Sequence, residues 1–183
     1  MRHTLSLVAA IALAGLTGPV TARAADLISY PTSTAQQLGV APATGAYDWN
    51  GFYAGVFGAY QHGATSGDRY GFGIDAGVDT TFNFVLAGAE VAVLGLGGDA
   101  GGTASVQGLG RAGLLLTDNA LLYGAGGYGI DLASPGDGDV LVGGGLEYAL
   151  GNGTSLRAQY LHGFPVTGTD AKEQVTLGAQ FHF

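Results

Sequence analysis

The stretch of sequence that decides the fold is Gln-Val-Thr-Leu-Gly-Ala-Gln-Phe-His-Phe, residues 174 to 183. Its alternate positions fall on opposite faces of a strand, because successive side chains of a strand point in opposite directions. One face is small or polar, and the other is apolar throughout, with Val175, Leu177, Ala179, Phe181 and Phe183. A strand of this kind that ends on an aromatic residue predicts the terminal strand of a membrane-spanning β-barrel.

Seven earlier stretches of the chain show the same alternation. In the clearest of them, residues 69–79, apolar residues alternate with glycine, aspartate or arginine. Ten residues at ~3.3 Å each, tilted by ~45°, cover roughly 23 Å, which is close to the height of the apolar band of a membrane barrel. We predict strands at residues 51–61, 69–79, 82–93, 104–116, 120–131, 140–150, 154–162 and 174–183.

The connections between these strands alternate in length. Short turns at one end and longer loops at the other are typical of outer-membrane barrels. The sequence therefore predicts an all-β fold, an eight-stranded antiparallel up-and-down transmembrane β-barrel with short periplasmic turns and modest extracellular loops. The predicted tight turns are 80–81, 117–119 and 151–153, and the longer connections are 62–68, 95–102, 132–138 and 163–173.

Aromatic residues on the outward face favour a bilayer over a soluble β-sandwich. They form two groups, as expected where a wall crosses two membrane interfaces. A sandwich would carry bulky residues inside and many charges outside, whereas the non-apolar face here is mostly glycine with a few charges. The loop-end group is Tyr60, Tyr70, Tyr128 and Tyr160, and the turn-end group is Phe52, Tyr148, Phe181 and Phe183.

The first residues predict export. Arg2 and His3 give a positive start, residues 5–16 are mostly apolar but too few to span a bilayer, and Ala22-Arg23-Ala24 matches a cleavage site. The predicted organisation is a signal peptide at residues 1–24, a flexible periplasmic linker at 25–48 and the barrel at 49–183.

Composition excludes several classes of protein. Without the leader the six basic residues fall to four against fourteen acidic ones, a formal charge of −10, so nucleic acid is excluded as a partner. There is no cysteine, so no disulfide staples the fold. Glycine contributes 35 of 183 residues. Inside alternating strands, glycine marks places where another backbone segment or a ligand approaches closely. In a narrow barrel it also leaves room for neighbouring side chains.

The lumen is predicted to hold a charge network of Glu90, Arg111, Glu147, Arg157 and Asp75. A tight turn centred on Asn152 places Glu147 opposite Arg157, and a loop centred near residues 100–101 places Glu90 close to opposite Arg111. Such pairs can line a pore or form a plug. The plug is favoured because the interior of an eight-stranded barrel is just filled by side chains.

Other sequence patterns do not predict a nucleotide, metal or catalytic site. Gly124, Gly126 and Gly129 match a dinucleotide-binding pattern, but no helix follows them. His62 and His162 lack organised further ligands, so we predict no metal site. We likewise predict no catalytic residue and no cofactor. We expect Asp99, Asp137 and Asp139 to be solvated loop carboxylates.

Three motifs resemble a known family. They are DWNGFYAG at 48–55, GGGLEYAL at 143–150 running into SLRAQYL at 155–161, and VTLGAQFHF at 175–183. On these motifs the mature chain is similar to alpha-proteobacterial outer-membrane β-barrel proteins of the porin-family, OmpA-like type. The resemblance implies a multi-pass barrel in the outer membrane of a Gram-negative cell, surrounded by outer-membrane lipid and lipopolysaccharide. It further implies that Phe181 and Phe183 are a signal for the barrel-assembly machinery, and that Ala25 and Asp26 are a candidate site of attachment to peptidoglycan.

We therefore expect a non-enzymatic outer-membrane barrel that contributes to envelope integrity. A small passive porin-like channel is the alternative, and it predicts discrete conductance. A lipid-active enzyme would need a polar catalytic group facing outward at bilayer depth, and the outward positions are almost uniformly apolar.

Overall fold

The chain forms a closed barrel. A computed structural model describes residues 47–98, 101–133, 138–166 and 169–183. None of these residues belongs to a helix long and apolar enough to cross a membrane. The strands are β1 (Gly51–Gly63), β2 (Gly67–Phe82), β3 (Val85–Gly98), β4 (Gly101–Thr117), β5 (Ala120–Asp131), β6 (Gly138–Gly151), β7 (Thr154–Pro165) and β8 (Lys172–His182).

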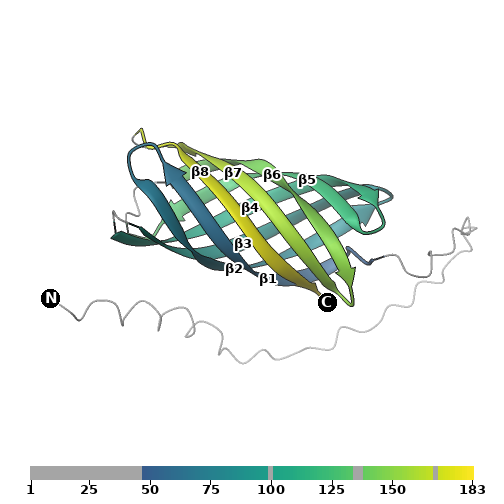
Figure 1. Ribbon diagram of the computed structural model, residues 1–183. Helices are drawn as coiled ribbons and strands as arrows, with labels where there is room; N and C mark the ends of the chain where they lie inside the picture. Colours follow the sequence, from purple (N-terminus) through teal and green to yellow (C-terminus); the bar gives the residue numbers. More distant parts are fainter. Residues whose placement is uncertain (1–46, 99–100, 134–137, 167–168) are drawn as a thin grey trace, which may run out of the picture. The chain divides into compact units, whose positions relative to one another are not determined.

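Each strand pairs antiparallel with its neighbours in sequence, and β1 pairs with β8 to close the sheet. Figure 1 shows the yellow β8 lying beside the blue β1 in a wall of strongly tilted strands. Closure leaves no unpaired sheet edge, so the backbone hydrogen bonds of the wall are satisfied internally. The predicted closed, eight-stranded antiparallel barrel is confirmed.

One predicted turn is wrong. Thr80 and Thr81 lie within β2, paired with Ala87 and Leu86 of β3. The chain turns instead at residues 83–84, where Asn83 has a φ of 58°. Asparagine tolerates this left-handed conformation, whereas the β-branched threonines favour a strand.

The strands also extend further into the longer connections than the sequence predicts. β1 and β2 are joined by residues 64–66 and β3 and β4 by residues 99–100 alone, while β5–β6 and β7–β8 are joined by 132–137 and 166–171. We call the barrel end that holds these connections the loop end, and the opposite end, with its two-residue turns, the turn end.

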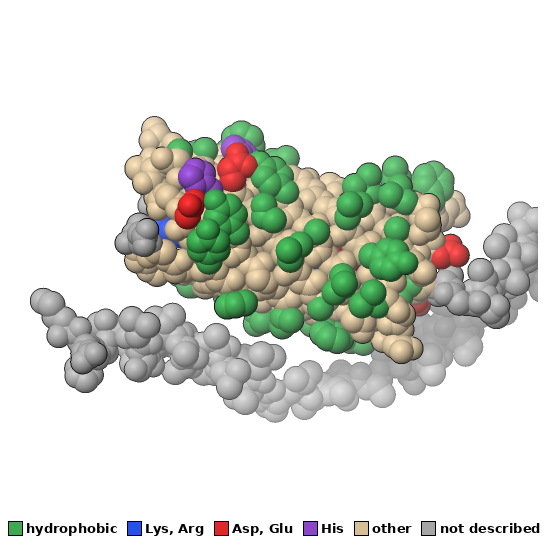
Figure 2. Space-filling view, viewed as in Figure 1, with side chains coloured by type: hydrophobic (Ala, Val, Ile, Leu, Met, Phe, Trp, Pro, Cys, Tyr) green, Lys and Arg blue, Asp and Glu red, His purple; other side chains and the backbone are tan. Residues whose placement is uncertain are grey.

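The outer wall is apolar and carries two aromatic belts. Figure 2 shows hydrophobic side chains spread over the side of the barrel. The predicted inward and outward faces of all eight strands are confirmed by the alternating burial. The most exposed outward aromatic residues include Phe52, Tyr70, Phe72, Tyr148, Phe181 and Phe183.

The inward face is a packed core, with more apolar side chains than the sequence analysis identified. One cluster of buried residues forms around Leu86, Leu109 and Leu121, and a second around Phe57 and Leu94. Segments such as residues 91–96 carry apolar residues on both faces, so their inward leucines do not stand out in an alternation pattern.

Candidate functional site

The candidate site is a charged layer across the lumen, and the β6–β7 hairpin supplies its first pair. Asn152 and Gly153 form the turn, with φ values of 53° and 71°. That turn places Glu147 directly opposite Arg157, and both side chains are buried. Arg157 Nε donates to Glu147 Oε2 at 3.0 Å. Ser155 Oγ donates to the other oxygen of Glu147 at 2.5 Å.

Arg111 of β4, which is separated from β6 by β5, joins the same carboxylate within the lumen. Its Nη2 donates to Glu147 Oε2 at 3.2 Å and to Asp79 Oδ2 at 2.7 Å. Asp79 was not a member of the predicted network. Its position on the same face of the strand as Asp75 was predicted, however. The Arg111 side chain is 2% exposed, so these ion pairs are shielded from solvent.

The predicted register of Glu90 against Arg111 is wrong by two residues. Gly88 lies opposite Arg111, and Glu90 lies opposite Leu109. The cause is the glycine-rich stretch from residue 95 to 102, which carries no marker of where the chain turns. A shift of two residues keeps the same face inward. Glu90 Oε2 consequently still lies 3.8 Å from Arg111 Nη1.

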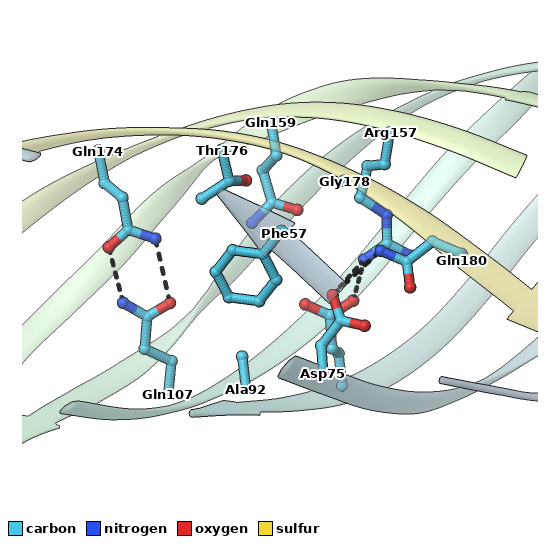
Figure 3. Close-up of a pocket in the computed structure, with 11 residues that line it drawn as sticks. Phe57, Asp75, Ala92, Gln107, Arg157, Gln159, Gln174, Thr176, Gly178 and Gln180 are labelled. Carbon is cyan, nitrogen blue, oxygen red and sulfur yellow. Dashed lines mark hydrogen bonds and ion pairs between the residues drawn. The ribbon is translucent and has the colours of Figure 1, made fainter. Parts of the chain in front are cut away.

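Arg157 completes the layer. Its Nη1 donates to Glu90 Oε2 and to Asp75 Oδ2, the latter at 3.4 Å. Gln180 of β8 donates to the same oxygen of Asp75 at 3.1 Å. Figure 3 shows Arg157, Asp75 and Gln180 converging from different strands. All five residues of the predicted network thus lie in one layer, with Asp79 as a sixth charged member.

Two tyrosines bracket the guanidinium groups. Arg111 Cζ lies 4.9 Å from the ring centre of Tyr53 and 4.8 Å from that of Tyr123, within the range of cation–π attraction. Tyr53 Oη donates to Glu90 Oε2 at 2.6 Å. These tyrosines were not among the predicted site residues. Their inward parity beside glycine-rich strands is the signal that could have identified them.

Inward-facing glycines make room for these rings. A Cβ at Gly77 would collide with the ring of Tyr53, and one at Gly145 would lie 2.6 Å from Tyr123 Oη. Gly178 lies similarly close to Phe57, where a Cβ would approach Phe57 Cβ to 2.7 Å. The space that glycine leaves is therefore occupied. Two small cavities within the lumen measure about 10 Å³ and 20 Å³, each enough for roughly one water molecule.

Polar side chains fill the lumen nearer the loop end. Gln107 Nε2 donates to Gln174 Oε1 at 2.8 Å, and Figure 3 shows Phe57 between this amide pair and the charged layer. Lys172 Nζ lies 2.7 Å from Asp139 Oδ2. Asp139 was expected to be a solvated loop carboxylate. That expectation is wrong, because β6 begins at Gly138 and turns Asp139 inward, where it is buried. Asp99 and Asp137 lie outside the described residues.

The segment before β1 closes the turn end of the lumen. Trp49 is 2% exposed, and its Nε1 donates to the carbonyl oxygen of Asp118 at 3.1 Å, in the β4–β5 turn. Tyr47 packs on Trp49 and its hydroxyl lies 2.7 Å from Nδ1 of His182 on β8. We call Tyr47 and Trp49 the cork. The predicted flexible linker includes Tyr47, whereas the structure packs this residue against the barrel.

The remaining predicted residues lie apart from the charged layer. Phe181 and Phe183 are exposed on the outer wall at the turn end. His62 and His162 lie on the outer wall at the loop end, on β1 and β7. Ala25 and Asp26 lie outside the described residues. Within the described part of the chain, no group of three or more His, Cys, Asp or Glu side chains is placed to hold a metal ion.

Three solved structures share this architecture. Ail, the attachment invasion locus protein of Yersinia pestis, solved in complex with the heparin analogue sucrose octasulfate, matches with a TM-score of 0.54 at 14% identity, over 73% of this chain and 99% of that one. Neisserial surface protein A matches with a TM-score of 0.53 at 13% identity, over 73% and 98%. The chain has the fold of an outer-membrane β-barrel.

The N-terminal β-barrel domain of OprF from Pseudomonas aeruginosa matches with a TM-score of 0.50 at 10% identity, over 72% of this chain and 99% of that one. At these identities the likeness concerns the fold alone. No protein-family model and no curated protein matches the sequence.

Proposed function

We propose that this protein is a non-enzymatic barrel of the bacterial outer membrane that does not conduct ions and contributes to envelope integrity. The observation that carries the proposal is the charged layer. Arg111 and Arg157 meet on the carboxylate of Glu147 inside the lumen, with hydrogen bonds of 3.2 and 3.0 Å.

The energetics of this layer favour a permanent plug. Opening a path would separate buried guanidinium groups from their carboxylates, and leaving one such charge unpaired costs about 3–5 kcal/mol. The cation–π contacts with Tyr53 and Tyr123 would be lost as well. A porin-like channel would need empty space beside the inward glycines, but aromatic rings fill that space at Gly77 and Gly145, and the Gln180 and Asp75 side chains fill it at Gly55.

The outer wall supports placement in a bilayer. On β8 the outward residues from Phe183 to Val175 are apolar, and the first charged outward residue is Glu173. The ten residue-to-residue steps from Glu173 to Phe183 cover roughly 23 Å at a tilt of ~45°, which matches the apolar band of outer-membrane barrels. In water so large an apolar surface would drive aggregation.

Planar-bilayer recording on refolded protein tests the proposal. We expect no discrete conductance from the wild type, with heat-dependent gel mobility of the same sample showing that the barrel is folded. The double variant Arg111→Ser and Arg157→Ser removes both long side chains of the plug and should give conductance steps. Reproducible steps from the wild type would contradict the proposal and favour a small passive channel.

Two more specific proposals, on family membership and on attachment to the cell wall, rest on the sequence motifs. We propose membership of the alpha-proteobacterial porin-family, OmpA-like group, and attachment to peptidoglycan through Ala25 and Asp26, with a linker of roughly twenty residues whose coil reach is about 25 Å. Mass spectrometry of muropeptides after lysozyme digestion should find an adduct on Ala25. Recovery of Ala25 only as a free amine would overturn the attachment.

A further inference from the structure

The tip of the β6–β7 hairpin, at the turn end of the barrel, is formed by Asn152 and Gly153. Asn152 is exposed and has a φ of 53°. Gly151 and Gly153, on either side of it, also have positive φ values, of 98° and 71°. The strand register shifts just before the turn, between Ala149 and Gly151. Glycine on both sides and an interrupted ladder leave few restraints on the backbone around Asn152.

The structure requires the glycine that follows Asn152. A Cβ at Gly153 would lie 2.8 Å from the carbonyl oxygen of His182, and the positive φ disfavours other residues as well. Asparagine is one of the few other residues that tolerate the left-handed conformation. An asparagine–glycine pair is therefore well suited to the tip of this hairpin, as it is to two-residue hairpin turns in general.

An asparagine followed by glycine can lose ammonia from its side chain without an enzyme. The backbone nitrogen of the glycine attacks the asparagine Cγ, and no Cβ stands in its path. The bond from Cγ to Nδ2 breaks, and Nδ2 leaves as ammonia with the proton of the attacking nitrogen. Water then opens the cyclic succinimide that remains, at either of its two carbonyl carbons, and gives aspartate or isoaspartate. Water is the only co-reactant, and nothing is oxidised or reduced.

The chain contains a second asparagine–glycine pair, which begins at Asn50, and the structure separates the two. Asn50 is also exposed, but its side chain is held in place. Its Oδ1 accepts hydrogen bonds from the backbone nitrogen and the hydroxyl of Thr81, at 2.7 and 2.8 Å, and its Nδ2 donates to Asp48 Oδ1 at 3.0 Å. Among the residues that the structure describes, no hydrogen bond holds the side chain of Asn152. The carboxamide of Asn152 is therefore able to rotate toward the next nitrogen, whereas that of Asn50 is not.

A third asparagine isolates the effect of the following residue. Asn83 forms the β2–β3 turn, is exposed, and has a φ of 58°, close to the 53° of Asn152. The residue after it is Phe84. The Cβ and ring of phenylalanine crowd the nitrogen that would attack. Asn83 thus shares the conformation and exposure of Asn152 but lacks the unhindered neighbour.

We propose that Asn152 is a modification site, at which spontaneous deamidation of the folded barrel forms isoaspartate. In isoaspartate the main chain runs through Cγ, so the product adds one methylene to the turn and one negative charge to the turn end. The reaction needs only the exposed turn and water. It is independent of whether the lumen conducts or the chain is attached to the cell wall.

The hairpin tip is joined to the cork, so its modification has a consequence elsewhere at the turn end. The backbone nitrogen of His182, near the end of β8, donates to the carbonyl oxygen of Gly153 at 2.7 Å (Figure 1). The ring of His182 in turn contacts the Tyr47 hydroxyl at 2.7 Å, and Tyr47 packs on Trp49. An added methylene displaces the Gly153 carbonyl group relative to β8. Isoaspartate at position 152 should therefore loosen the cork.

Peptide mapping by mass spectrometry tests the site on refolded barrel aged at neutral pH, with heat-dependent gel mobility confirming that the sample stays folded. We expect a mass gain of about 1 Da at Asn152, as an amino group is replaced by a hydroxyl group. Labelling by isoaspartyl methyltransferase identifies the isoaspartate. Asn50 should react about tenfold more slowly, because its hydrogen bonds must break first, and Asn83 more slowly still.

The chain unfolded in urea is the control for the role of the fold. There Asn50 loses its hydrogen bonds and should react at nearly the rate of Asn152, while Asn83 stays slow. Equal rates at Asn50 and Asn152 in the folded barrel, or no reaction at Asn152, would overturn the proposal. A difference between them that persists in urea would overturn the protection assigned to the contacts of Asn50.

Two variants test the link to the cork through acrylamide quenching of Trp49. In aged wild type, quenching should rise in step with the isoaspartate content. Asn152→Gly keeps the left-handed turn and has no carboxamide, so ageing should leave its quenching unchanged. Asn152→Asp introduces the charge without the methylene and tolerates the same φ, so before ageing it should match fresh wild type. Quenching that rises equally in aged Asn152→Gly, or stays constant in aged wild type, would overturn the link.

Discussion

Glu147 Oε2 accepts hydrogen bonds from both Arg157 and Arg111, so one carboxylate oxygen joins the β6–β7 hairpin to β4, a strand that pairs with neither β6 nor β7. The Arg157 contact crosses a local hairpin, whereas the Arg111 contact comes from β4, 36 residues earlier in the chain. This shared oxygen makes Glu147 the central residue of the plug.

Replacing Glu147 should therefore be costly. Glu147→Gln weakens the hydrogen bonds that both buried guanidinium groups make to this side chain, while Asp79 still pairs with Arg111 and Asp75 and Glu90 with Arg157, and we expect the free energy of unfolding to fall by about 1–3 kcal/mol. Urea unfolding of the refolded barrel in lipid vesicles measures the change. The control is Asp118→Asn, since the Asp118 side chain is exposed in a turn, where a charge contributes at most about 1 kcal/mol. A loss below about 1 kcal/mol for Glu147→Gln would contradict a structural role for the layer.

Glycines on the two faces of the wall should respond oppositely to alanine. Gly178→Ala places a Cβ 2.6 Å from the carbonyl oxygen of Val56 and 2.7 Å from Phe57 Cβ, which should cost about 1–3 kcal/mol of folding stability. Gly126→Ala faces outward, with its nearest neighbour 3.7 Å away, and should be neutral or slightly stabilising. The same unfolding assay measures both variants, and equal losses would show that the lumen is less tightly packed than the structure indicates.

Trp49 is the only tryptophan in the chain, so its fluorescence reports on the cork directly. Because its side chain is buried, we expect blue-shifted emission and weak quenching by acrylamide in the folded barrel. Tyr47→Ala removes the ring that packs on Trp49 at a centroid distance of 4.7 Å and should increase the quenching of Trp49, because the indole becomes more accessible to acrylamide. Unchanged quenching would mean that Tyr47 does not shield the indole.

The same probe should show an alkaline transition. Burial raises the pKa of Tyr47 from 10.0 to about 12, with the charges of Glu147 and Asp48 adding to the effect and a hydrogen bond to Ser155 opposing it. A pKa raised in the folded state stabilises the closed cork fully below pH 10, and this stabilisation is lost as the pH rises toward 12. Quenching of Trp49 should therefore increase between pH 10 and 12. Tyr47→Phe removes the titrating group, and persistence of the transition in that variant would assign it to another residue.

Deleting Phe183 should affect assembly more than stability. The residue is 79% exposed at the turn end, where its backbone nitrogen donates to Phe52 O at 2.9 Å. We expect lower amounts of folded protein in the outer membrane, by about fivefold, with less than about 1 kcal/mol change in unfolding because few contacts are lost. Phe52→Ala is the matched control, an exposed aromatic residue of the same belt that is not terminal. Normal membrane levels of the deletion would contradict an assembly role.

The sequence by itself determined which residues of the barrel wall face inward or outward. It also determined the pairing of Glu147 with Arg157, which lie close together in the sequence. Strand parity depends only on the two-residue period of the backbone, so the inward and outward faces of all eight strands follow from alternation. Glu147 and Arg157 are placed opposite each other by the short turn at Asn152 and Gly153, which only a few residues control.

Only the tertiary structure decided how the lumen is filled. The partners of Arg111 come from β2 and β6, so they depend on how the sheet closes and how neighbouring strands are staggered, which no local pattern encodes. The register of β3 on β4 is set within a glycine-rich stretch whose residues specify no turn position. The cork joins Trp49 to a turn 69 residues away. Because the contacts of Arg111 and of the cork join segments that are distant in sequence, closure of the barrel, rather than any single strand, produced the plug.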